Sequence, residues 1–120
     1  MKINNVVIIG SGTMGSGIAA HLCNANISVT LLDVKTEISK NAIDRIVKSR
    51  PPLLFDKSKA KNIQIGNIND NFDIVKRADW ILEAVVEKID IKQQIYDKIF
   101  KTRKEDSIVS SNTSTIPLKI

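Results

Sequence analysis

Two patterns of apolar residues alternate along the chain. Short apolar runs bounded by glycine or polar residues are typical of buried strands, and apolar residues spaced three or four positions apart predict helices. The predicted strands are residues 5–9, 27–32, 62–66, 80–86 and 107–110. The predicted helices run from the glycines near position 15 to about 24–26, then over 36–49, 73–77 and 89–101, with a short basic turn or helix at 57–61 and a polar loop at 67–71.

Strands that alternate with helices favour a parallel sheet with right-handed crossovers. We therefore predict an α/β fold of the Rossmann type, a doubly wound parallel sheet with helices on both faces. With 120 residues, the chain has the length of one domain. We expect the sheet to be incomplete at its C-terminal end, so that the last strand presents an open edge to a second copy or another polypeptide.

A glycine-rich turn joins the first predicted strand to the first predicted helix. Its sequence, GSGTMG at positions 10–15, matches the dinucleotide-binding fingerprint. Gly10 allows a tight turn, Gly12 lets a pyrophosphate approach the backbone, and Gly15 lets the helix pack closely on the strand. The positive end of the helix dipole would attract the pyrophosphate.

Asp33 ends the second predicted strand, about twenty residues after the turn, where the fingerprint has its acid. Its carboxylate can accept hydrogen bonds from the ribose hydroxyls of NAD and would repel the additional phosphate of NADP. NAD is therefore the predicted cofactor. FAD, or a site that has lost its use, remains an alternative, because a glycine turn alone is a weak signal.

Charge is unevenly distributed along the chain. Residues 35–61 carry eight basic and three acidic side chains, which accounts for the whole net charge of +5. This segment could bind an anionic ligand, or it could be a solvated helix and loop. We do not expect nucleic-acid binding, because aromatic residues make up only 4% of the chain and do not alternate with the basic ones.

The sequence also indicates a location. It shows no signal peptide, and its apolar runs are far shorter than the ~20 residues that span a bilayer. Cys23 is the single cysteine, so no internal disulfide can form. We expect a cytoplasmic protein without a membrane segment or a metal site.

Three stretches resemble the NAD-binding domain of L-3-hydroxyacyl-CoA dehydrogenases, the oxidoreductases of fatty-acid β-oxidation. They are VIIGSGTMGSGIA at 7–19, ADWILEAVVE at 78–87 and SSNTS at 110–114. The first also occurs in other dehydrogenases, whereas the second and third are more specific. The resemblance covers nearly all of residues 1–120 and implies an NAD-binding domain whose C-terminal helical partner domain is absent.

The resemblance also implies roles for single residues. Glu87 and Lys92 would lie against the cofactor, and the hydroxyl of Ser114 would lie between nicotinamide and substrate. Glu87 could instead act only as an acid at a helix N-terminus, and Ser114 could simply cap a helix. The expected cofactor-binding residues are thus Gly10, Ser11, Gly12, Thr13, Met14, Gly15, Asp33, Glu87, Lys92 and Ser114, and the expected substrate-binding residue is Ser114.

Two further features bear on the family's chemistry. The resemblance implies that the basic segment 35–61 contacts the phosphate-bearing end of coenzyme A, although the spacing near Pro51 departs from the family. Glu83 stands inside an apolar strand, where an unpaired acid costs several kcal/mol. We therefore expect it near the end of that strand or beside a partner.

Family chemistry requires a histidine base held by a glutamate. The motif that carries this histidine follows the Asn-Thr-Ser segment in the family and is not present here, so no residue is predicted to be catalytic. His21 is the only histidine, and we expect it at a helix surface or in packing. The isolated chain is expected to bind NAD without oxidising acyl-CoA.

Two hypotheses remain open at this point. In the first, the chain is part of a 3-hydroxyacyl-CoA dehydrogenase that obtains its catalytic half from another polypeptide. In the second, it is a non-catalytic NAD-binding remnant of a split or decaying gene.

Overall fold

The computed structural model describes residues 3–48, 62–84 and 89–111 of the chain. In chain order, the elements are β1 (Asn5–Ile9), α1 (Thr13–Asn24), β2 (Ser28–Asp33), α2 (Thr36–Lys48), β3 (Ile63–Asn67), the 3₁₀-helix η2 (Phe72–Arg77), β4 (Trp80–Glu83), α3 (Ile89–Thr102) and β5 (Ile108–Ser111). No helix in the described part of the chain is both long enough and apolar enough to cross a membrane.

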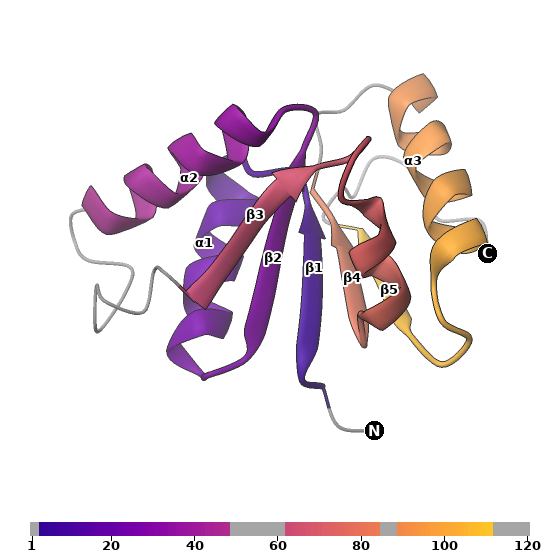
Figure 1. Ribbon diagram of the computed structural model, residues 1–120, viewed down its shortest axis with the longest axis horizontal. Helices are drawn as coiled ribbons and strands as arrows, with labels where there is room; N and C mark the ends of the chain where they lie inside the picture. Colours follow the sequence, from indigo (N-terminus) through magenta and orange to yellow (C-terminus); the bar gives the residue numbers. More distant parts are fainter. Residues whose placement is uncertain (1–2, 49–61, 85–88, 112–120) are drawn as a thin grey trace.

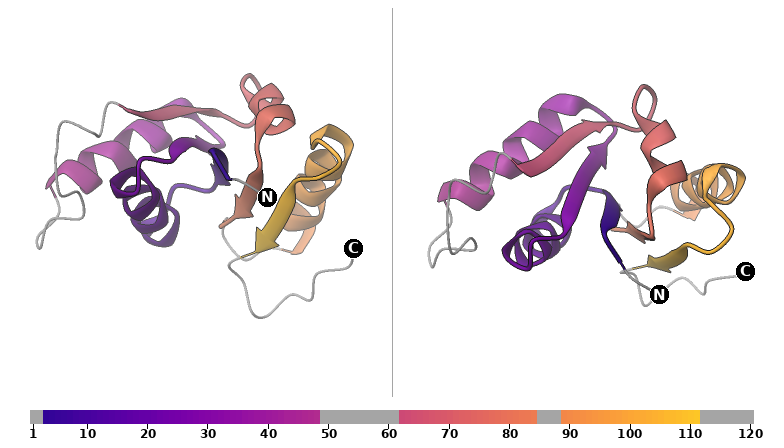
Figure 2. Two further views of the ribbon diagram at one scale, coloured as in Figure 1. Left: turned by 90° about the horizontal axis from the view of Figure 1, so that it is seen from below. Right: turned by 60° about the horizontal axis from the view of Figure 1, so that its bottom comes forward.

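The described strands form one sheet in the order β3-β2-β1-β4-β5, and every neighbouring pair is parallel. The helices α1 and α2 lie on one side of the sheet, and η2 and α3 lie on the other (Figures 1 and 2). The predicted doubly wound α/β class is confirmed. Since all strands run the same way, their carboxyl ends meet at one edge, where Ile9 stands opposite both Leu32 and Glu83.

Both faces of β1 are buried, which explains its uninterrupted apolar sequence. Alternate side chains enter two separate cores. The core under α1 and α2 contains Val6, Ile8, Ala19, Ala20, Cys23, Val29, Leu31, Ala42, Ile46, Ile63 and Leu82. The core under η2 and α3 contains Val7, Ile9, Leu32, Ile68, Phe72, Val75, Ala78, Ile81, Ile95 and Ile99.

Several element boundaries differ from the sequence predictions. The strand predicted over 80–86 ends at Glu83, and residues 85 and 86 lie outside the described residues, as does the basic turn predicted at 57–61. The strand predicted over 62–66 includes Asn67, which we assigned to a loop. The helix predicted at 73–77 is a 3₁₀-helix that begins at Phe72.

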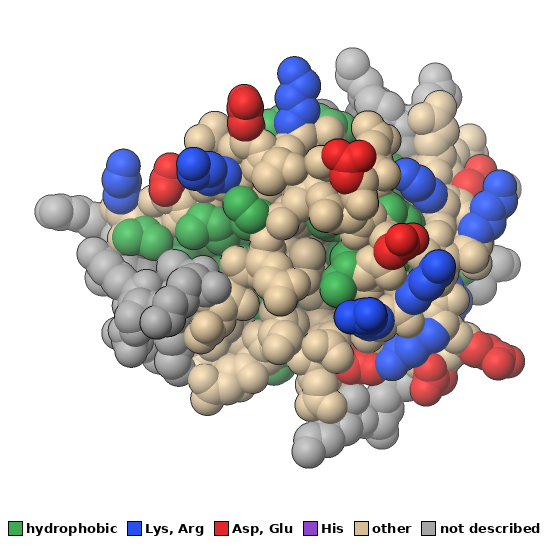
Figure 3. All heavy atoms as spheres, in the orientation of Figure 1, with side chains coloured by type: hydrophobic (Ala, Val, Ile, Leu, Met, Phe, Trp, Pro, Cys, Tyr) green, Lys and Arg blue, Asp and Glu red, His purple; other side chains and the backbone are tan. Residues whose placement is uncertain are grey.

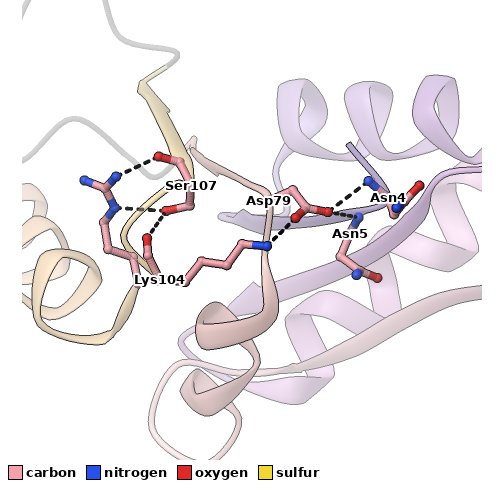
Figure 4. Close-up of polar contacts among 6 residues, drawn as sticks. Asn4, Asn5, Asp79, Lys104 and Ser107 are labelled. Carbon is pink, nitrogen blue, oxygen red and sulfur yellow. Dashed lines mark hydrogen bonds and ion pairs between the residues drawn. The ribbon is translucent and has the colours of Figure 1, made fainter. Parts of the chain in front are cut away.

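Asp79, directly before β4, joins the amino ends of three strands (Figure 4). Its Oδ2 accepts hydrogen bonds from the backbone N–H of Asn4 and Asn5, at 2.9 and 3.0 Å. Its Oδ1 accepts a hydrogen bond from Lys104 Nζ, in the loop before β5, and the two side chains form an ion pair. The hydrogen bond from Lys104, together with the two N–H groups, lowers the pKa of Asp79 to about 2.

Gly15 brings α1 close to the end of β1. A Cβ atom at this position would lie 2.1 Å from the carbonyl oxygen of Gly10 and 3.3 Å from the side chain of Ile8. The N–H of Gly10 is bound to the carbonyl of Leu32, and β1 is paired on both sides, so α1 can pack here only without that side chain. A Cβ at Gly17, half a turn further along α1, would meet nothing within 4 Å.

Substituting Asp79→Asn should lower the free energy of unfolding most at neutral pH. The folded-state pKa of Asp79 is below its usual value of 3.8, so its stabilising contribution is present above about pH 4 and is lost as the pH falls towards 2. Urea unfolding across this pH window should show the difference between wild type and variant shrinking as the pH falls. The control is Asp73→Asn, whose exposed carboxylate lies 3.8 Å from Lys76. A difference for Asp79→Asn that persists in acid would contradict the assignment.

Substituting Gly15→Ala should destabilise the fold by about 1–3 kcal/mol, the usual cost of overpacking. Gly17→Ala on the same helix should instead stabilise it by about 0.5–1 kcal/mol, because alanine is the better helix former and the site is open. Thermal or urea unfolding of the two variants gives both values. Equal effects of the two substitutions would show that the close approach at Gly15 carries no energy.

Candidate functional site

The turn after β1 and the end of β2 meet at the carboxyl edge of the sheet. Asp33 Oδ2 accepts two hydrogen bonds from Ser11, from its backbone N–H at 2.8 Å and from its hydroxyl at 2.7 Å. The turn is held a second time by Gly10, whose N–H donates to the carbonyl of Leu32 at 2.7 Å. The fold thus brings the predicted glycine turn and its predicted acid into direct contact.

The backbone of the turn needs glycine for two different reasons. Gly10 has a φ of 108°, a conformation that L side chains rarely adopt. Gly12 is exposed, and nothing lies within 4 Å of the position its Cβ would take. The backbone at Gly12 is therefore open to a ligand.

Gly12 is the N-cap of α1, and it provides no side chain to cap the helix. The first turn of α1 carries no acidic residue either. The positive end of the helix dipole is therefore not neutralised by a carboxylate on the helix itself, which favours an anionic group beside the turn.

Arg45, on α2, also contacts the turn, and sequence reasoning did not assign it there. Its Nη2 donates hydrogen bonds to the carbonyl oxygen of Ser11 at 2.5 Å and to Ser16 Oγ at 3.3 Å. In the sequence, Arg45 was one of several basic residues on an amphipathic helix. No sequence signal separated it from Lys40 or Lys48, because the contact depends on how α2 packs against α1.

A pocket of about 380 Å³ lies beside Asp33, between the ends of β2 and β3. Val34, which is 57% exposed, gives it an apolar surface. Asn67 shapes the opposite wall, since its Nδ2 donates to Thr36 Oγ1 at 3.1 Å and to Asp70 Oδ2 at 3.0 Å. No sequence pattern predicts this pocket, because it forms between loops that follow two different strands.

Glu83 is the last residue of β4 and is fully buried. Its Oε1 accepts a hydrogen bond from the hydroxyl of Tyr96, on α3, at 3.0 Å. Both expectations for this acid are confirmed, since it stands at the end of its strand and has a partner. The contact joins the carboxyl end of β4 to α3.

The remaining predicted site residues are not fully described. Glu87 and Ser114 lie outside the described residues. Thr13 and Met14 begin α1, and Lys92 lies in the first turns of α3, but the side chains of these three are not described.

His21 is exposed near the end of α1, in agreement with the predicted surface position. At 1.5 Å per residue, it lies about 12 Å along the helix from Thr13 and the glycine turn.

Other hollows of the surface lie away from the turn. A cleft of about 320 Å³ on the exposed face of β2 and β3 is lined by Thr30, Gln64 and Arg77, among others. Neither the glycine turn nor Asp33 lines it. On that side of the molecule, basic and acidic side chains are mixed and do not form a patch of one sign (Figure 3). The described residues contain no group of metal-ligating side chains.

Comparison with known proteins agrees with the geometry at this edge. The family model described as "3-hydroxyacyl-CoA dehydrogenase, NAD binding domain" matches residues 5–120. A probable 3-hydroxyacyl-CoA dehydrogenase of Deinococcus radiodurans is 39% identical over 100% of this chain and 37% of its own length. A putative fatty acid oxidation complex trifunctional enzyme of Rickettsia felis is 42% identical over 98% of this chain and 17% of its own.

The crystal structure of (S)-3-hydroxybutyryl-CoA dehydrogenase from Ralstonia eutropha is similar in fold, with a TM-score of 0.79 and 29% identity. The similarity covers 96% of this chain and 42% of that one. The chain thus spans less than half of the length of each of these three proteins. It belongs to the 3-hydroxyacyl-CoA dehydrogenase family and corresponds to the family's NAD-binding domain.

Proposed function

We propose that this chain supplies the NAD site of a dehydrogenase that oxidises L-3-hydroxyacyl-CoA to 3-oxoacyl-CoA in fatty-acid β-oxidation. The observation that carries the proposal is the contact between Ser11 and Asp33, at 2.7 and 2.8 Å. It aligns an open glycine turn, a helix N-terminus and a strand-end acid at the carboxyl edge of a parallel sheet. In such sheets, ligands bind at this edge, where the strand order reverses.

The residues present fit a dinucleotide. The pyrophosphate would lie against the backbone of Gly10, Gly12 and Gly15, where Gly12 leaves room. The adenine would enter the pocket beside Val34, which offers an apolar contact. Bound NAD would supply the hydride acceptor for the oxidation, and the protein's role at this edge is to bind and orient it.

Asp33 would hold the adenosine ribose. A carboxylate has about four acceptor positions. Three are taken by donors from the described residues: Oδ2 accepts two bonds from Ser11, and Oδ1 accepts one from the N–H of Val34 at 2.7 Å. The position that remains on Oδ1 suits a ribose hydroxyl and would repel the phosphate of NADP.

The nicotinamide side would be formed by Glu87, Lys92 and Ser114, with the hydroxyl of Ser114 directed at substrate. In support, Glu87 and Ser114 each follow a strand whose carboxyl end lies beside that of β1 or β4. The hydrogen bond between Tyr96 and Glu83 would hold α3, which carries Lys92, next to this end of β4.

The substrate would be an acyl-CoA. Lys35, Lys40 and Lys48 are exposed along and before α2, where they could bind the phosphates of coenzyme A. We further propose a cytoplasmic location, in keeping with Cys23, a buried free thiol.

The catalytic histidine and its glutamate would come from polypeptide outside these 120 residues. His21, the only histidine in the sequence, is exposed on α1 and about 12 Å along the helix from the turn. The outer edge of β5, which pairs only with β4 among the described strands, would receive the neighbouring part of the dehydrogenase. Ile108 on this strand is 42% exposed and would be covered by that contact.

Substituting Asp33→Ala should weaken NAD binding by about 10- to 100-fold, because a hydrogen bond to a charged group contributes about 1.5–3 kcal/mol. NADP binding should weaken less or improve, since the repulsion of its additional phosphate is removed. Isothermal titration calorimetry with both nucleotides measures the two effects.

The control for this experiment is Asp73→Ala, which removes the same charge from an exposed position on η2. The control variant should bind NAD like the wild type. An unchanged dissociation constant for NAD in the Asp33 variant, with an unchanged preference over NADP, would refute the proposed ribose contact.

A further inference from the structure

Arg45, on α2, donates hydrogen bonds to the backbone of the glycine turn and to a serine of α1. The residue belongs to the basic segment that suggests coenzyme A binding, yet its Nη2 lies 2.5 Å from the carbonyl oxygen of Ser11. The same nitrogen donates to Ser16 Oγ at 3.3 Å. The hydroxyl of Ser16 in turn donates to the Ser11 carbonyl at 2.8 Å. A guanidinium and a hydroxyl thus hold one carbonyl oxygen.

Every polar group of Ser11 takes part in a hydrogen bond. Its N–H and its hydroxyl donate to Asp33, and its carbonyl accepts from Arg45 and Ser16. The residue has no exposed surface. The orientation of the peptide between Ser11 and Gly12 is therefore fixed by side chains from β2, α1 and α2.

This orientation decides where the N–H of Gly12 points. In a trans peptide, the C=O and the following N–H lie in one plane and point in opposite directions. Because Arg45 and Ser16 both bind the Ser11 carbonyl, the N–H of Gly12 is turned away from them. Gly12 is exposed, and the space around its Cβ position is open.

We propose that Arg45 is a positioning residue for NAD, which orients the Gly12 N–H towards the cofactor's pyrophosphate by holding the Ser11 carbonyl. The inference rests on the proposed function of the turn and adds a residue from α2 to it. If the peptide could rotate, its carbonyl would face the pyrophosphate in part of the population. The partially negative carbonyl oxygen would then lie against the negatively charged phosphates. Fixing the peptide removes these unproductive conformations before the ligand binds.

The test compares Arg45→Gln with Arg77→Gln, an exposed arginine at the end of η2 that loses the same charge and the same number of atoms. Each variant is titrated with NAD by calorimetry and with adenosine, which has no phosphate, by NMR. Arg45→Gln should raise the dissociation constant for NAD about tenfold, the effect of one charge-assisted hydrogen bond. Its affinity for adenosine should not change, and Arg77→Gln should bind both ligands like the wild type.

The amide signal of Gly12 in the ligand-free protein separates positioning from simple charge attraction. It should move in Arg45→Gln and stay in place in Arg77→Gln, because the peptide between Ser11 and Gly12 changes its orientation only when the hydrogen bond from Arg45 is lost. Weaker NAD binding with an unmoved Gly12 signal would mean that Arg45 acts through its charge alone, and would overturn the proposal. Equal losses for NAD and adenosine would overturn it as well.

Ser16→Ala provides a second variant that does not depend on α2. It removes the other donor to the same carbonyl and should also weaken NAD binding and shift the Gly12 signal. If the wild type binds NAD and both Arg45→Gln and Ser16→Ala bind it equally well, the inference about Arg45 is overturned and the proposed function stands. No NAD binding by the wild-type chain would instead overturn the proposed function on which it rests.

Discussion

The contact between Ser11 and Asp33 determines how the first half of the molecule is arranged. It joins residues that are 22 positions apart and fixes the turn after β1 to the end of β2. Gly10 allows this turn because it adopts a positive φ. Gly15 allows α1 to pack beside the turn because it has no Cβ that would clash with the Gly10 carbonyl. A side chain at Gly10 would strain the turn, and one at Gly15 would push α1 away from the Gly10 carbonyl.

The amino and carboxyl ends of the strands differ in what their polar groups bind. At the amino edge, Asp79 is largely enclosed and binds two backbone N–H groups and Lys104, so it holds strand ends together. At the carboxyl edge, the loops leave Gly12 and Val34 exposed beside an acid. The groups that remain accessible therefore lie at the carboxyl edge, where ligands bind in such sheets.

The sequence was sufficient for the fold class and for the core of the candidate site. Continuous apolar runs identify buried parallel strands, and the spacing from the glycines to Asp33 predicts that these residues meet at one edge of the sheet. The apolar runs are a local signal, and the spacing depends only on the length of the crossover from β1 to β2. The end of β4 was placed too late because Ala84, Val85 and Val86 prolong the apolar run, and apolar density does not reveal where strand pairing stops.

Other parts of the site depend on packing between elements that are distant in sequence. Arg45 reaches the turn only because α2 lies beside α1, and neighbouring lysines on the same helix look equivalent in the sequence. The pocket beside Val34 needs Asn67 from the end of β3 as its second wall. That Glu83 needs a partner could be predicted from the cost of burying an acid, but Tyr96 could not be named, because this contact depends on how α3 packs against the end of β4.

We propose that the turn and Asp33 form the NAD site at the carboxyl edge of the sheet. Titration of the isotope-labelled chain with NAD, followed through its backbone amide signals, tests it most directly. We expect the signals of Gly10, Gly12 and Val34 to shift in a saturable way, and those of Asn5 and Lys104 at the amino edge to stay in place. Shifts centred on Thr30 and Gln64, on the open face of β2 and β3, or no shifts at all, would contradict it.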